Sequence, residues 1–130
     1  MCPLCNIKEN IIFEDEFLKI VLVKEIDGYV RVIPHKHIKE LSELSNKELI
    51  SLTLLIKKIE KIMLNTLNPD KINVASLGNM VAHLHIHIIP RFKNDPWWPG
   101  ATFCKEATFN HLPEKKLKEF ISQIKSLNAK

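Results

Sequence analysis

The run His83-Leu84-His85-Ile86-His87 constrains the fold of this chain more than any other part of the sequence. Histidines alternate there with aliphatic residues, and the apolar stretch continues to Pro90. Side chains of a β-strand point alternately to its two faces, so the histidines line one face and the aliphatic residues the other. The run therefore predicts a strand at residues 83–89 that packs on one side and carries three imidazoles on the other. Imidazole titrates near neutral pH, attacks as a nucleophile and binds metals.

Hydrophobic periodicity predicts the remaining elements. Further strands are expected at residues 11–14, 17–24, 29–33 and 72–76, with a hairpin turn at Asp27-Gly28. Ser45 and Glu48 have the spacing of a capping box, which begins a helix that runs to about Asn65. Pro113 suits the first turn of a last helix, at about residues 113–127. This order predicts one α+β domain over residues 1–130, with about five antiparallel strands and two main helices.

Composition limits the classes of function that the chain can have. No apolar stretch approaches the ~20 residues of a membrane span, and no basic and apolar leader begins the chain. We therefore expect a cytoplasmic protein with no membrane partner. The net charge of +4 suits a small anionic ligand, whereas the 7% aromatic content without basic interleaving argues against a nucleic-acid partner. Three cysteines without an export signal argue against a disulfide framework.

The three histidines allow a metal site, a nucleophile or an ordinary structural role. Residues i and i+4 of a strand lie roughly 13 Å apart, and a Zn–N bond measures only about 2.1 Å. A site made by all three histidines of one strand is therefore disfavoured, although two alternate histidines can reach one ion. A neutral histidine can instead attack phosphorus and form a phospho-imidazole intermediate. Single histidines are usually surface or hydrogen-bonded core residues, but strict alternation of three favours a site.

The motif resembles the signature of the histidine-triad (HIT) family, in which three histidines alternate with apolar residues and two further apolar residues follow. Other segments are also similar to family segments, so that the resemblance covers residues 2–100. These are Val32-Ile33-Pro34 followed by His37-Ile38, Gly78-Asn79 and Pro90-Arg91. The resemblance implies a HIT-like fold, a homodimer, and hydrolysis or transfer of nucleotides at the α-phosphate.

The resemblance also implies a role for each site residue. His85 would be the nucleophile that becomes nucleotidylated, and His87 would contact the α-phosphate. Asn79 would supply an amide near the phosphate or the leaving group. A histidine at the third position favours a hydrolase, because nucleotidyltransferases of the wider superfamily usually carry glutamine there.

The chain departs from the family pattern at three places, and these bear on the substrate. Met80 stands where many members have a serine or threonine beside the phosphate. Asn79 is one methylene shorter than the usual glutamine. At residues 21–24 there is no acidic residue of the kind that usually holds the ribose hydroxyls.

The N-terminal Cys2-Pro3-Leu4-Cys5 allows a redox pair, two unrelated thiols or half of a metal site. Structural zinc takes four nitrogen or sulfur ligands, so two more residues would be needed. Bacterial family members resemble the chain here, and their pattern implies structural zinc at Cys2, Cys5, His37 and His83, with no organic cofactor. His35, two residues before His37, is a rival ligand.

The run Trp97-Trp98-Pro99-Gly100 has two interpretations. Tryptophans in a turn usually act as apolar anchors. A similar stretch in the nucleotide-binding branch of the family implies contacts with the dimer partner or the leaving group.

The resemblance to the HIT family implies a homodimeric nucleotide hydrolase with a purine nucleotide substrate, and the alternating histidines by themselves predict only a reactive face. Its substrate would be a dinucleoside polyphosphate or a nucleoside phosphoramidate, cleaved through a nucleotidyl-His85 intermediate. A non-catalytic, zinc-stabilised module that binds nucleotides or proteins is the alternative. A catalytic metalloenzyme, with its metal held by the triad, is a third possibility.

Overall fold

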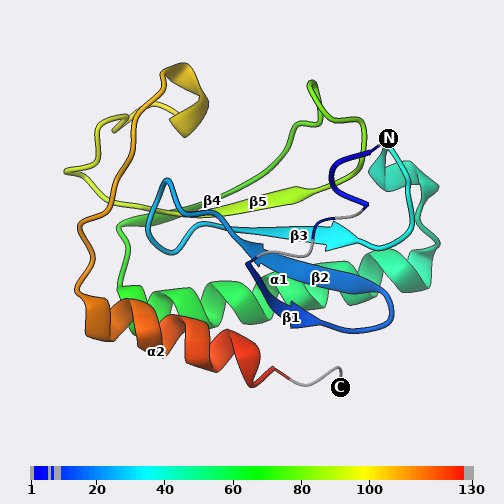
Figure 1. Cartoon of the computed structure of the whole chain (residues 1–130), viewed down its shortest axis with the longest axis horizontal. Coiled ribbons are helices and arrows are strands. Elements are labelled where there is room, and N and C mark those ends of the chain that lie inside the picture. The colour runs from blue at the N-terminus through cyan, green and yellow to red at the C-terminus, as the bar shows by residue number, and fades with distance from the viewer. Residues whose placement is uncertain (1, 6, 8–9, 128–130) are drawn as a thin grey trace.

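The computed structural model describes residues 2–5, 7 and 10–127, and it has the expected α+β architecture (Figure 1). The described part contains one five-stranded antiparallel sheet and two α-helices. The strands are β1 Ile11–Glu14, β2 Leu18–Leu22, β3 Val30–Pro34, β4 Lys71–Ser76 and β5 Ile86–Arg91. The helices are α1 Asn46–Leu67 and α2 Glu114–Lys125, with short 3-10 turns at Leu41–Glu43 and Thr102–Cys104.

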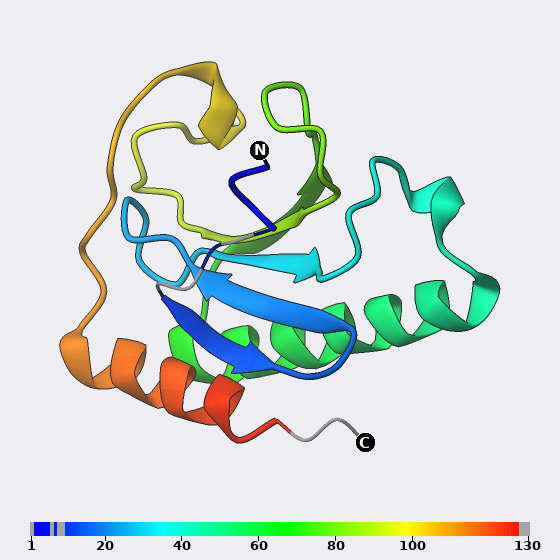
Figure 2. The ribbon, with the colours of Figure 1, turned by 45° about the vertical axis from the view of Figure 1, so that its right-hand side comes forward.

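The strand order β1-β2-β3-β5-β4 places β3 and β5 side by side at the middle of the sheet. Both helices cover one face, and the segments before β1 and after β5 lie over the other (Figures 1 and 2). On this second face Val21 pairs with Arg31, and Arg31 pairs with His87. Cross-strand partners point to the same side of a sheet. We call this the histidine face.

Helix α1 forms where the capping box predicted it. The Ser45 hydroxyl accepts a hydrogen bond from the Glu48 backbone at 3.1 Å, and the Glu48 carboxylate accepts one from the Ser45 backbone at 2.9 Å. The last residue of the helix is Leu67, two residues later than predicted, and it is followed by Asn68 at the C-cap, whose φ of 51° is left-handed. Its buried residues pack with Phe120 and Ile124 of α2 against the sheet, and no helix in the described ranges is long and apolar enough to cross a membrane.

The alternation predicted at residues 83–89 is confirmed, although the bounds of the strand are not. Leu84, Ile86 and Ile88 belong to the main core, while the three histidines are buried outside it. Strand β5 begins only at Ile86, because the Leu84 amide donates to the Ile38 carbonyl at 2.7 Å instead of to a neighbouring strand.

Pro90 does not end the strand, contrary to the sequence prediction. It pairs with Ile72 of β4 inside the ladder, and the strand continues to Arg91. The pairing of β5 with β3 stops at Val30 and Ile88, so at Pro90 the ladder has a neighbour on one side only. Proline, which has no N–H to donate, is tolerated at such an edge-like position.

Candidate functional site

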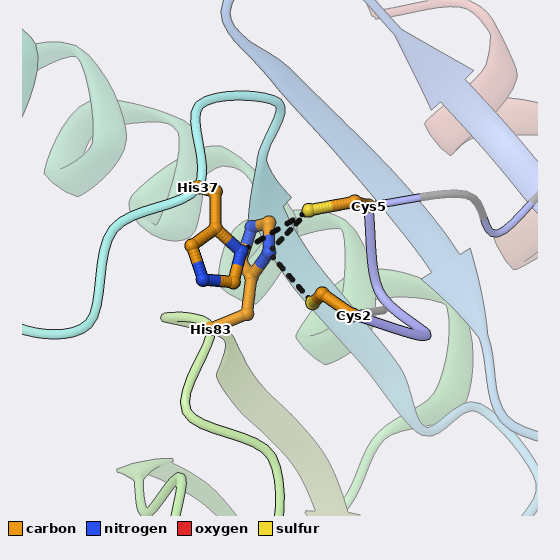
Figure 3. A group of neighbouring side chains, drawn as sticks. All are labelled: Cys2, Cys5, His37 and His83. Atoms are coloured by element: carbon orange, nitrogen blue, oxygen red, sulfur yellow. Dashed lines mark hydrogen bonds between the residues drawn. The ribbon is translucent and has the colours of Figure 1, made fainter.

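Four predicted metal ligands come together at one end of the histidine face (Figure 3). Cys2 and Cys5 come from the N-terminal turn, His37 from the loop after β3, and His83 from the segment before β5. Their ligand atoms all lie within 4.8 Å of one another. The two Sγ atoms lie 3.3 Å from His83 Nδ1, and Cys5 Sγ lies 3.1 Å from His37 Nδ1. The cluster could hold a metal ion.

The hydrogen bond of His83 selects the ring nitrogen that a metal would need. A carbonyl oxygen can only accept, so the His83 Nε2–H donates to the Pro34 carbonyl at 2.8 Å. The electron pair of Nδ1 then points toward the sulfur atoms. Metal-binding histidines ordinarily use such a second hydrogen bond to set the tautomer and the ring orientation. Two thiols and two imidazoles held in this way fit a tetrahedral metal site of the structural kind.

The N-terminal turn is held against the sheet by a buried lysine. Lys19 of β2 is only 3% exposed, and its Nζ donates to the Leu4 carbonyl at 2.8 Å. The Leu4 side chain packs on Val21 and Ile33 of the histidine face. These contacts place both cysteines beside His83. His35, the rival ligand, lies away from the cluster, because its Nε2 donates to the Asp15 carbonyl at 2.8 Å.

His85 is joined through the backbone to His83 of the candidate metal site. Its Nδ1–H donates to the His83 carbonyl at 2.7 Å, and the side chain is 8% exposed. The proton of the neutral ring is thereby held on Nδ1, so Nε2 carries a free electron pair. An imidazole in this state can act as a nucleophile or as a base.

His87 lies next to His85, with ring centroids 4.7 Å apart in an edge-to-face arrangement. Its Nδ1 lies 2.5 Å from the Tyr29 hydroxyl. Its Nε2 is buried and has no hydrogen-bond partner among the described residues. Burial first, and then the charges of His85 and Arg31, lower the pKa of His87 to about 4. His87 is therefore neutral at pH 7.

A cavity of about 940 Å³ is lined by Tyr29, Arg31 and Phe103, which are neighbours of His87, whereas no histidine of the triad lines it. Its volume falls in the range of small-molecule sites. The Phe103 ring, which follows β5 in the chain, lies 5.3 Å from the His87 ring. The cavity is lined by Val23, Glu25, Ile26, Tyr29, Arg31, Trp97, Thr102, Phe103, Lys105, Glu106, Ala107 and Thr108.

Sequence analysis did not assign Tyr29 and Arg31 to the site. Their alternation in Tyr29-Val30-Arg31-Val32 places both on one face of a strand, which was the available signal. The alternation does not, however, predict that their strand pairs with β5.

Asn79 is exposed on the loop between β4 and β5. Within the described part of the chain, no hydrogen bond joins it to His85 or His87. The preceding Gly78 has a φ of 69°, which favours glycine in this turn. Met80, at the same loop, is 98% exposed.

The tryptophan loop is anchored within its own chain. Arg91 and Asp95 form a buried ion pair with an Nε–Oδ2 distance of 2.8 Å, and the Asp95 carboxylate also accepts from the backbone amides of Trp97 and Trp98. Trp97 is 6% exposed and donates from Nε1 to the Lys105 carbonyl at 2.9 Å. These contacts support the interpretation of Trp97 as an apolar anchor.

Known proteins share both the sequence pattern and the fold. A family model described as the HIT domain matches residues 5–94. An uncharacterised HIT-like protein of Mycoplasma genitalium is 38% identical over 72 residues, covering 52% of this chain and 51% of that protein. The asymmetrical bis(5'-nucleosyl)-tetraphosphatase of Schizosaccharomyces pombe is 31% identical over 75 residues, covering 54% and 41% respectively. The match thus spans only about half of the length of the first relative and 41% of the length of the second.

A solved structure extends the likeness to most of the fold. The histidine triad protein from Marinobacter aquaeolei is 29% identical, with a TM-score of 0.72, and the match covers 88% of this chain and 89% of that one. The chain belongs to the HIT family, whose signature is the alternating triad at residues 83–87.

Proposed function

We propose that the protein is a nucleotide hydrolase that acts at the α-phosphate of a dinucleoside polyphosphate or a nucleoside phosphoramidate. The observation that carries the proposal is the pair His85 and His87. One ring offers a free electron pair, and the other has a buried nitrogen without a partner among the described residues. A cavity is lined by Tyr29, Arg31 and Phe103, which neighbour His87. The similarity to a bis(5'-nucleosyl)-tetraphosphatase supports a nucleotide substrate, and the cavity has room for one.

The proposed reaction has two steps at phosphorus. His85 Nε2 attacks the α-phosphorus, a P–N bond forms, and the bond to the leaving group breaks with its electrons passing to that group. Water then attacks the same phosphorus and loses a proton to the medium, and the P–N bond breaks with its electrons returning to His85 Nε2. The nucleoside monophosphate leaves and neutral His85 is restored. His87 holds a phosphoryl oxygen, and donors aimed at developing charge lower the barrier. Asn79 is proposed as a further phosphate contact, on the resemblance alone.

We propose that zinc is the metal of the Cys2, Cys5, His37 and His83 cluster, since two thiolates and two imidazoles are its usual structural ligands. The ion would tie the N-terminal turn to the segment that carries His83, and it takes no part in the reaction. A homodimer is also proposed, because the edge strand β4 and helix α1 expose apolar residues. These are Ile50, Leu54 and Val74, which are 59%, 52% and 44% exposed.

The test is a substrate panel with His85→Ala and a matched histidine control. Dinucleoside polyphosphates and adenosine phosphoramidate are supplied, and hydrolysis is followed by chromatography. His85→Ala is expected to lower kcat by at least roughly 10³-fold, because it removes the nucleophile. His111→Ala, which changes an exposed histidine outside the triad, is expected to retain wild-type rates.

Mass spectrometry of a single turnover separates this proposal from its alternatives. A nucleotidyl adduct on His85 of the wild type supports the hydrolase. Near-normal hydrolysis by His85→Ala would contradict it. Tight nucleotide binding by the wild type without turnover would favour the non-catalytic module instead.

A further inference from the structure

We propose that Tyr29 and Arg31 are positioning residues, which hold His87 as a neutral hydrogen-bond donor toward the phosphoryl group. The consequence for catalysis rests on the function proposed above, whereas the state of the His87 ring does not. Tyr29 precedes β3, and Arg31 lies within it as the cross-strand partner of His87. The pairing of β3 with β5 therefore brings all three side chains together on the histidine face.

Two hydrogen bonds connect the three side chains in series, from Arg31 to Tyr29 and from Tyr29 to His87. Arg31 Nε lies 3.3 Å from the Tyr29 hydroxyl oxygen, and its guanidinium carbon lies 5.5 Å from the centre of the Tyr29 ring. The same hydroxyl lies 2.5 Å from His87 Nδ1. Tyr29 is 6% exposed and His87 is 4% exposed, so water does not readily replace these partners. The guanidinium, in contrast, is only half-buried and lines the cavity.

Donor and acceptor capacity decides where the protons lie. Arginine has donors only, so the Tyr29 oxygen accepts from Arg31 Nε–H. Among the described residues the hydroxyl has no acceptor other than His87 Nδ1, so its single proton is directed to that nitrogen. A neutral imidazole that accepts at Nδ1 carries its own proton on Nε2. That N–H is the buried group without a partner in the described part of the chain.

His85 and His87 are therefore held in opposite tautomers. The His83 carbonyl keeps the proton of His85 on Nδ1, whereas the Tyr29 hydroxyl keeps the proton of His87 on Nε2. A nucleophile with a free electron pair beside an N–H donor matches a phosphoryl group, in which phosphorus is attacked and oxygen gains charge. If His87 took the other tautomer, its Nε2 electron pair would face those oxygens and repel them.

The experiment measures the ring nitrogens of His87 by two-bond ¹⁵N–¹H correlation NMR at pH 7, together with kinetics. The wild type is expected to show His87 protonated at Nε2 and unprotonated at Nδ1. Tyr29→Phe removes the donor and keeps the ring, so we expect a mixture of both tautomers. We expect kcat on a dinucleoside polyphosphate to fall roughly tenfold, the cost of one lost hydrogen bond, with a smaller change in KM.

Arg31→Met is a second test of the inference, and Thr66→Val is its control. Arg31→Met frees the Tyr29 oxygen to accept, so the tautomer mixture should appear there too. Thr66→Val removes a hydroxyl hydrogen bond to the Ile62 carbonyl, on α1 and away from the histidine face. It should reproduce any general loss of stability while leaving the tautomer and kcat unchanged.

The possible outcomes separate this inference from the proposed function. A wild-type His87 protonated at Nδ1 would overturn the inference, as would a Tyr29→Phe protein with unchanged tautomer and unchanged kcat. If the wild type hydrolyses none of the substrates but Tyr29→Phe and Arg31→Met still shift the tautomer, the hydrolase proposal fails and the positioning role is supported.

Discussion

The three histidines of the motif differ in the hydrogen bond that each ring makes, because each has a different partner. His83 donates to the Pro34 carbonyl and turns its electron pair to the cysteines. His85 donates to the His83 carbonyl. His87 lies against the Tyr29 hydroxyl and is neutral at pH 7. Each of these hydrogen bonds selects the nitrogen that carries the proton, and the proposed roles of ligand, nucleophile and donor depend on which ring nitrogen is left to act and on what it faces.

A pH dependence of stability follows from the buried state of His87. Its pKa is about 4 in the folded protein and roughly 6.5 when unfolded. Below pH 6.5 the unfolded chain binds a proton that the folded protein takes up only near pH 4. The free energy of unfolding should therefore be highest above pH 6.5 and fall toward pH 4, by up to about 3 kcal/mol from this residue.

Urea unfolding of the wild type and of His87→Gln between pH 4 and 7.5 checks this expectation. The variant has no titrating ring at this position, so its free energy of unfolding should decline less steeply over the same interval. Both proteins keep the metal ligands, and the difference between their slopes isolates His87. Equal slopes would contradict the assignment.

Helix α1 is determined by residues close in the sequence, whereas the bounds of strand β5 depend on residues that are distant in the sequence. Residues close in sequence specify α1, since the cap, the apolar spacing and the left-handed Asn68 all lie within or beside it. In contrast, β5 begins where its neighbours allow, because the Leu84 amide bonds to the Ile38 carbonyl of a distant loop. Short-range signals accordingly predicted the helix to within two residues and misplaced both ends of the strand.

The contribution of the capping box to the stability of helix α1 can be tested by substitution. Ser45→Ala should lower the free energy of unfolding by about 1 kcal/mol, because the Glu48 amide loses its acceptor. Ser51→Ala makes the same substitution on the exposed interior of α1 and should leave the stability unchanged or slightly raised. Urea unfolding measures both. Equal losses in the two variants would show that the cap contributes nothing specific.

At the scale of the whole molecule, the candidate site is assembled from parts that lie far apart in the chain. The candidate metal site joins the N-terminal turn, the loop after β3 and the segment before β5 (Figure 3). The His83 carbonyl in turn accepts a hydrogen bond from His85 and so holds the His85 ring in place. Loss of the metal should thus affect the fold first and the reactive ring second.

Cys2→Ser tests this dependence, with Cys104→Ser as the matched control because Cys104 is an exposed cysteine outside the cluster. Elemental analysis should find about one zinc ion per wild-type chain and much less in Cys2→Ser, since a thiolate ligand is lost. The melting temperature of Cys2→Ser should fall by at least roughly 5 °C, and that of Cys104→Ser should not change. Metal that is retained in Cys2→Ser and is essential for activity would indicate a catalytic ion at the triad.

Much of the protein follows from residue types and their spacing. The alternation at residues 83–87, the cap at Ser45 and the order of the elements predicted the α+β fold and the histidine face. Cys2 and Cys5 predicted only half of a metal site, and the resemblance to family members supplied His37 and His83, which the structure places beside them. These signals are local: a period of two or 3.6 residues, or a chemical type that can bind a metal. Even the face of Tyr29 and Arg31 could be read from their alternation.

Only the tertiary structure decided what each side chain meets. The pairing of β3 with β5 brings Arg31 beside His87, and the chain after β5 folds back so that Phe103 contacts the same ring. Hydrogen-bond partners across such distances depend on register and on the path of loops, which no local pattern encodes. The physical reason is that a tautomer is selected by the nearest donor or acceptor in space, whatever its position in the sequence.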